Sequence, residues 1–220
     1  MGRRLSFADT DFGVQGVETE HVLARLRETC WADGAAQVQD WAACDEFAGV
    51  FGTSETFEHT AWRLESRCRY QAAEQSAAYQ RFVTGQRAGP GPAPEEPRGA
   101  GRRRQPALGR RVERVRVVDD PPTLGQLYLL DAARRNARAG EDVRNLWRAD
   151  AEWLKLPGED FWLFDSRVLA VLRFDDADRL TGIEVVTEPQ EVLRACQVRD
   201  AAWHHAVPFE EFGARVRASD

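Results

Sequence analysis

One stretch of six residues, "DFWLFD" at positions 160–165, constrains the fold of this chain more than any other. Successive side chains of an extended strand point to opposite sides. Phe161 and Leu163 therefore face one way, while Trp162 and Phe164 face the other. Both faces of this strand are apolar, so each needs a covering layer. We expect a strand in the interior of a sheet that helices cover on both faces.

Strand-like and helix-like runs alternate along the rest of the chain. The predicted strands are residues 61–70, 112–118, 141–147, 160–165, 167–174 and 182–188. The predicted helices are residues 72–85, 123–140 and 149–158, the last with a turn, and a final amphipathic helix from Pro189 through Val192, Leu193, Cys196 and Trp203. This order predicts an α/β (α+β) fold, with a mixed β-sheet of about five to six strands flanked by helices.

Two details of this pattern define helix and strand limits. Thr123 is a candidate N-cap of the helix over residues 123–140, and Gly140 is its candidate terminator. In residues 61–70 apolar and charged side chains alternate, which predicts a half-buried strand with Arg63 and Glu65 on its polar face.

Glycine, proline and arginine dominate residues 85–111, which contain almost no residue able to enter a core. We interpret this segment as a flexible linker inside a single domain over residues 45–213, with an N-terminal helical extension over residues 1–44 and a tail over 214–220. Arg102, Arg103 and Arg104 can hold a phosphate backbone, weakly and with a steep salt dependence. No aromatic residue is interleaved for base stacking, so nucleic acid is not otherwise expected as a partner.

Composition narrows the function classes. The net charge of −6, from 36 acidic and 30 basic residues, argues against a protein devoted to nucleic-acid or anionic-membrane binding. No apolar run approaches the roughly 18 residues of a membrane span, and the first residues lack the apolar core of a secretory signal. We expect a cytoplasmic protein without a membrane partner. The four cysteines form no C-x-x-C pair, so neither a zinc site nor a disulfide framework is expected.

Five ordered motifs resemble one known family. They are "TAWRLESRCRY", "RVRVVDDPP", "NARAGEDVRNL", "LPGEDFWLFDSRVLAVLRFDD" and "AAWHHAVPFEEF". The chain resembles an actinobacterial family of uncharacterised proteins, domain of unknown function 6879. Its members are similar to accessory genes beside helix-turn-helix transcriptional regulators, which implies a regulatory setting and a regulator as partner. The strand order is also similar to the half-domain of phospholipase D-like proteins, some of which serve as ligand-sensing domains.

Several catalytic chemistries lack their residues. Phospholipase D-type catalysis needs a histidine two residues before a lysine, but Lys155 is the only lysine and no histidine stands there. The glycine patterns of serine hydrolases, of P-loop proteins and of dinucleotide-binding proteins are also missing. We therefore assign no catalytic residue, cofactor or metal ligand.

Charged residues on the predicted strands form a candidate ligand site. Its members are Arg63, Glu65, Arg116, Glu141, Asp142, Arg144 and Asp165. Asp165 follows its strand, and open α/β sheets place ligands beyond the carboxyl ends of their strands. Bidentate arginines can bind a small anionic ligand. The alternative is a set of cross-strand ion pairs on a solvated sheet face.

Three functions remain open, and direct nucleic-acid binding through the arginine-rich linker is the third of them. The first is a non-enzymatic regulatory or ligand-sensing protein that acts with a helix-turn-helix regulator. The second is a phosphodiesterase- or nuclease-like hydrolase that uses Glu65, Asp142 and Asp165. The hydrolase requires at least two of these carboxylates within metal-bridging reach, about 4 Å apart.

Overall fold

The computed structural model describes residues 57–85 and 109–218. The predicted extension over residues 1–44 and the predicted linker, apart from its two ends, lie outside these residues, as do Arg102, Arg103 and Arg104.

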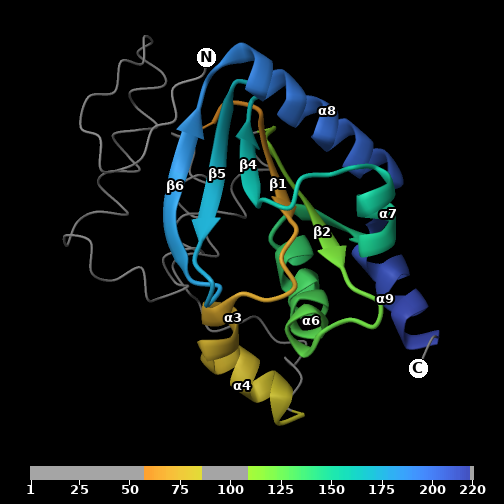
Figure 1. Cartoon of the computed structure of the whole chain (residues 1–220). Coiled ribbons are helices and arrows are strands. Elements are labelled where there is room, and N and C mark those ends of the chain that lie inside the picture. Colours follow the sequence, from red (N-terminus) through yellow and green to blue (C-terminus); the bar gives the residue numbers. More distant parts are fainter. Residues whose placement is uncertain (1–56, 86–108, 219–220) are drawn as a thin grey trace.

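A mixed sheet of seven strands forms the centre of the described fold (Figure 1), in the order β6-β5-β4-β1-β2-β3-β7. The strands are β1 (Thr60–Glu65), β2 (Arg111–Val118), β3 (Glu141–Trp147), β4 (Phe161–Phe164), β5 (Val168–Phe174), β6 (Leu180–Val186) and β7 (Val207–Pro208). Strands β1, β2 and β3 are parallel, and all other pairings are antiparallel. The fold class is as predicted. The additional strand is β7, whose two residues are too short to give a periodic pattern.

Helices lie on both faces of this sheet. They are α3 (Gln71–Gln75), α4 (Ala77–Val83), α6 (Leu124–Arg138), α7 (Arg148–Trp153), α8 (Pro189–His205) and α9 (Phe209–Ala218). Helices α7 and α8 pack on one face, which we call the α8 face, and α6 and α9 pack on the other face at β3, which we call the α6 face. Figure 1 shows α8 running along the α8 face and α6 behind β2.

Strand β4 has the two apolar faces that its sequence predicts. Phe161 and Leu163 join the hydrophobic cluster beneath α8. Trp162 and Phe164 point to the opposite side and pack with Ala170 of β5. The strand lies in the interior of the sheet, between β5 and β1. All four residues are buried, and their alternation between two hydrophobic clusters confirms the assignment of side chains to faces.

The limits of α6 follow from its capping residues. The Thr123 hydroxyl accepts a hydrogen bond from the backbone N–H of Gln126, and the Gln126 side chain accepts one from the backbone N–H of Thr123. This capping box satisfies N–H groups that have no partner within the helix. Gly140 follows the helix with φ of 93°, a conformation that glycine adopts without steric cost. Both predicted limits are confirmed.

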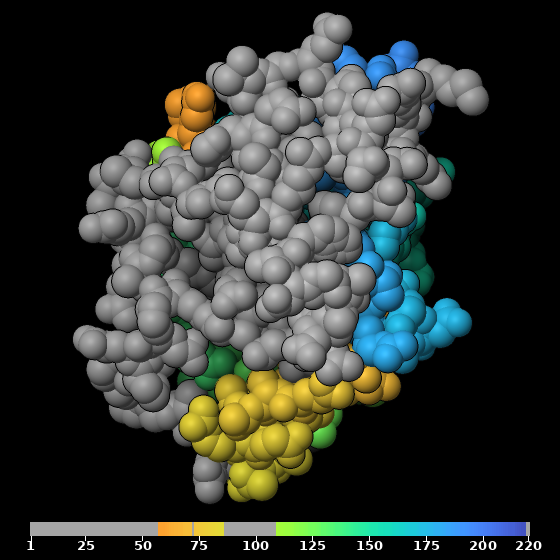
Figure 2. Space-filling model, turned by 90° about the vertical axis from the view of Figure 1, so that its left-hand side faces the viewer, coloured from red at the N-terminus to blue at the C-terminus, as the bar shows by residue number. Residues whose placement is uncertain are grey.

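Strand β1 is shorter than predicted, because it ends at Glu65 rather than at Tyr70. The backbone N–H of Ser66 donates to the Asp160 carboxylate, so the chain leaves the sheet at that residue. Beyond it, Arg67 pairs with Asp178 in the turn between β5 and β6. Figure 2 shows α4, in yellow, at the lower end of the molecule beside that hairpin, in blue.

The exposed face of α8 also differs from the prediction. Leu193, predicted on the apolar face of this helix, is 60% exposed, whereas Val192, Ala195 and Ala202 are buried.

Within residues 57–85 and 109–218 no helix has the length and apolarity needed to cross a bilayer.

Candidate functional site

Charged side chains occupy the α6 face of the parallel strands. Arg63 lies beside Arg114 in the register of β1 and β2, and Glu65 lies beside Arg116. All four are at most 5% exposed. The cross-strand ion pairs of the alternative hypothesis do form. The face that carries them is buried, however, so the expected solvent exposure of that face is wrong.

Glu65 is the centre of this network. Its Oε1 accepts from Arg114 Nη1 at 2.5 Å, its Oε2 accepts from Arg116 Nε, and Arg63 Nη2 lies 3.3 Å from Oε1. Burial raises the pKa of Glu65, but the three guanidinium groups outweigh burial and hold this pKa well below its usual range. The carboxylate is ionised at neutral pH and both of its oxygens are engaged. A general base needs a pKa near the working pH and a free oxygen, and Glu65 has neither.

The network extends from Glu65 to a third strand and to a helix. Arg114 Nε donates to Glu141 Oε1 at 2.6 Å, which joins β2 to β3. Arg116 Nη1 donates to the carbonyl oxygen of Leu129 in α6, also at 2.6 Å. Four of the predicted site residues, Arg63, Glu65, Arg116 and Glu141, thus meet in one place, together with Arg114.

Asp160 belongs to the same network, although it was not among the predicted site residues. It is buried, and its Oδ1 accepts from the backbone N–H and the hydroxyl of Ser66 at 2.7 and 3.0 Å. The Tyr70 hydroxyl donates to Oδ2, which lies 3.9 Å from Arg63 Nη2. Burial raises the pKa of Asp160, and Arg63 opposes this rise. Local periodicity does not determine the direction of β4, so the contact of Asp160 with the end of β1 could not be predicted.

Asp165 lies at the opposite edge of the sheet from the one predicted. Because β4 runs antiparallel to β1, its exit lies at the start of β1. The Asp165 carboxylate accepts the backbone N–H groups of Glu58, His59 and Thr60 at 2.7, 2.8 and 2.7 Å. The length of β1, five residue steps of about 3.3 Å, separates this position from Glu65.

Asp142 and Arg144 lie on the α8 face, because alternate residues of β3 point to opposite sides. The Arg144 guanidinium lies 3.9 Å from the centre of the Trp203 ring, and its Nη2 lies 3.5 Å from Asp142 Oδ2. Glu65, Asp142 and Asp165 are therefore spread over two faces and two edges. The arrangement required by the hydrolase hypothesis is not formed, and the described residues hold no cluster of three or more His, Cys, Asp or Glu side chains suited to a metal.

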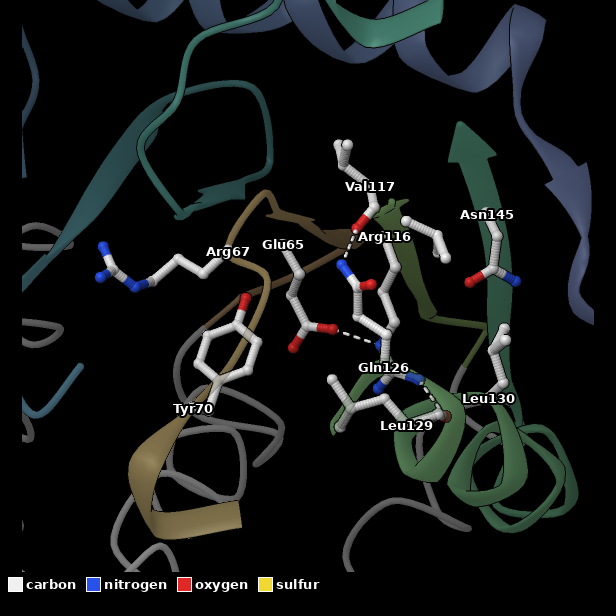
Figure 3. A pocket seen from close by; sticks show the side chains of 10 residues that line it. Glu65, Arg67, Tyr70, Arg116, Val117, Gln126, Leu129, Leu130 and Asn145 are labelled. Atoms are coloured by element: carbon white, nitrogen blue, oxygen red, sulfur yellow. Dashed lines mark hydrogen bonds and ion pairs between the residues drawn. The ribbon is translucent and has the colours of Figure 1, made fainter. Parts of the chain in front are cut away.

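A small pocket opens at the carboxyl ends of β1, β2 and β3, between the sheet and α6 (Figure 3). Its polar lining consists of Glu65, Arg67, Tyr70, Arg116, Gln126 and Asn145, and valine and leucine side chains of β2 and α6 complete it. The enclosed volume is about 10 Å³. Open α/β sheets bind ligands at this edge, so the pocket is the candidate functional site.

Four polar lining residues were not among the predicted site residues: Arg67, Tyr70, Gln126 and Asn145. Asn145 is fully buried in β3, and within the described part of the chain neither its Oδ1 nor its Nδ2 has a hydrogen-bond partner. Gln126, by contrast, donates to Asp119 Oδ2 at 3.1 Å and to the carbonyl oxygen of Val117 at 3.5 Å. The available signal was the position of Asn145 between Val143 and Trp147 on one face of the strand, because an amide on an apolar face has no solvent to pair it.

The pKa of Asp160 leads to a pH-dependent prediction. A carboxyl group whose pKa is higher in the folded state contributes stability below its unfolded pKa and loses it as the pH rises through the folded pKa. We expect the free energy of unfolding of wild type, relative to Asp160→Asn, to fall as the pH rises from about 3 to 7. Urea melts at several pH values measure this difference. The contribution of Glu65 to the pH dependence of stability cancels, because both proteins contain Glu65. A constant or rising difference would contradict the prediction.

Comparison with known proteins adds a family. A family model described as "Domain of unknown function (DUF6879)" matches residues 45–214. No curated protein matches the chain. Among solved structures, the chain is similar to TrmBL2, described as an archaeal chromatin protein that shows a novel mode of DNA binding. The TM-score is 0.37 at 10% sequence identity, and the alignment covers 87% of this chain and 61% of that one.

Proposed function

Because the chain belongs to the DUF6879 family, whose description assigns no activity, we propose from its geometry that it is a non-enzymatic ligand-sensing protein that acts with a helix-turn-helix transcriptional regulator. One observation carries the proposal. The pocket at the carboxyl ends of β1, β2 and β3 is lined by polar side chains, and the carboxylate among them, Glu65, is bound by arginines.

The charge network favours binding over catalysis. Acid–base catalysis needs a group that gains and loses a proton near the working pH. Glu65 stays ionised, and Tyr70, whose pKa burial raises well above its usual range, stays protonated. The network joins β1, β2, β3 and α6, so a ligand that enters beside it can alter the packing of α6 on the sheet.

Arg63 and Asn145 both lie on the α6 face of the sheet, and each side chain can recognise a ligand. Within the described residues Nε and Nη2 of Arg63 make no hydrogen bond, although the side chain is only 3% exposed and Nη2 lies 3.3 Å from Glu65 Oε1 in an ion pair. These two nitrogens form one side of the guanidinium fork, which matches a carboxylate or a phosphate. A small anionic ligand therefore remains part of the proposal. The regulator partner rests on the resemblance of the chain to accessory proteins of such regulators.

A ligand panel tests the sensing role. We expect at least one member of a panel containing inorganic phosphate, citrate, uracil and benzamide to raise the melting temperature of the full-length protein, because a ligand that binds only the folded state stabilises it. Arg194→Gln on the exposed surface of α8 should respond like wild type. If no member of the panel shifts the melting temperature at millimolar concentration, the sensing role is wrong.

Capture from the native host addresses the partner. The tagged full-length protein should retain a helix-turn-helix regulator. Deletion of the gene that encodes the tagged protein should change transcription of the genes that this regulator controls. The absence of both effects would contradict the regulatory part of the proposal and leave the ligand result standing.

A further inference from the structure

We infer that the pocket at the carboxyl ends of β1, β2 and β3 recognises a neutral planar group with a cis-amide edge, an N–H beside a carbonyl, through the side chain of Asn145. The inference rests on the proposed function, since it names the chemical class of ligand for the same site.

The first argument is the unpaired amide of Asn145. The residue is 0% exposed, and among residues 57–85 and 109–218 both of its polar atoms lack a hydrogen-bond partner. Leaving a buried polar group unpaired is costly, because it has lost its hydrogen bonds to water. Asn145 lines the pocket and lies beside Arg116 in the register of β2 and β3 (Figure 3). A group entering the pocket can supply the missing donor and acceptor.

The second argument concerns charge. Arg67 pairs with Asp178, and Arg116 pairs with Glu65 and with the carbonyl oxygen of Leu129. An anion at this pocket would have to displace one of these pairs, whereas a neutral ligand leaves them intact. Anion recognition at Arg63 and amide recognition at Asn145 are therefore separable.

The third argument concerns shape. Leu129 and Leu130 of α6 and Val118 of β2 give the pocket apolar walls, which suit a flat ring with little charge. The enclosed volume of about 10 Å³ holds roughly one water. With the side chains as they stand, this space admits only the edge of a ligand, and the ring enters where the leucine side chains of α6 move away from the sheet. An asparagine amide donates to and accepts from such an edge with two hydrogen bonds, as it does with adenine.

Calorimetric titration of the full-length protein tests this inference. The probes are uracil and benzamide, which carry the cis-amide edge, and 1,3-dimethyluracil, which keeps the ring and lacks the N–H donors. We expect uracil to bind wild type at least about tenfold more tightly than 1,3-dimethyluracil, since one good hydrogen-bonded pair discriminates by about 1–3 kcal/mol. Asn145→Leu should lose at least this factor for uracil. Asn136→Leu on α6 is the matched control and should bind uracil as wild type does.

Three results would overturn the inference. They are no binding of uracil or benzamide to wild type, equal binding of uracil and 1,3-dimethyluracil, and unchanged uracil binding by Asn145→Leu. A melting temperature of Asn145→Leu at or above that of wild type, without any bound probe, would instead assign the pocket to one ordered water. If phosphate or citrate still stabilises wild type, the sensing role survives any of these failures. If phosphate and citrate also fail to stabilise wild type, both the sensing role and the recognition of an amide edge by Asn145 are wrong.

Discussion

Replacement of Glu65 by glutamine is expected to lower the free energy of unfolding by about 3–5 kcal/mol, because removal of one partner from a buried charge network leaves the others uncompensated. Arg63, Arg114 and Arg116 all lie within 3.3 Å of this carboxylate, and each is at most 5% exposed. Glutamine keeps the size of the side chain and removes its charge. Urea unfolding at neutral pH, followed by tryptophan fluorescence, measures the loss.

The matched control is Glu191→Gln. Glu191 forms an exposed ion pair with Arg194 on α8, and such surface pairs contribute about 0–1 kcal/mol. The two substitutions change the same chemical group, and they differ in burial and in the number of arginine partners, three for Glu65 and one for Glu191. A loss below about 1 kcal/mol for Glu65→Gln would show that the three arginines find other partners or solvent, and it would remove the basis for a rigid network beside the pocket.

Replacement of Asp165 by alanine is expected to lower the free energy of unfolding by about 2–4 kcal/mol, because three backbone N–H groups lose a charged acceptor. The donors, Glu58, His59 and Thr60, lie 2.7–2.8 Å from the carboxylate oxygens. Asp165 also has φ of 50°, a left-handed conformation that alanine adopts at a cost of about 1–2 kcal/mol.

Two further variants separate these contributions. Asp165→Asn keeps a residue that tolerates the left-handed conformation, so its smaller loss isolates the carboxylate charge. Asp176→Ala, at an exposed position in the turn between β5 and β6, should change the stability by less than about 0.5 kcal/mol. Equal stability of wild type and Asp165→Ala would mean that the three N–H groups find water instead.

The predictable part of the fold is the part that local periodicity determines. The two apolar faces of β4 and the capping residues of α6 follow from neighbours in sequence, and the structure confirms them. The end of β1 at Glu65 was missed, because the acceptor that draws Ser66 out of the sheet, Asp160, lies 94 residues away. Local alternation contains no information about such a distant partner.

The candidate site shows the same division. Alternation correctly placed Arg63 with Glu65, since residues two apart share a face of a strand. Strand direction separated the remaining candidates, because antiparallel β4 carries Asp165 to the start of β1 and brings Asp160 to its end. The sequence marks Asn145 as an amide between Val143 and Trp147, but its place in a pocket depends on the packing of α6 on the sheet, which local alternation does not contain.

The position of β1 between β2 and β4 means that the domain cannot be divided into two halves. Residues 57–85 supply β1, and residues 109–218 supply the strands on either side of it and the Asp165 carboxylate that fixes its start. A fragment that begins at residue 109 would expose two open sheet edges in place of one shared strand, and open edges pair with other chains. The two parts of the polypeptide therefore act as a complementing pair, in which the shorter part completes the middle of the longer one.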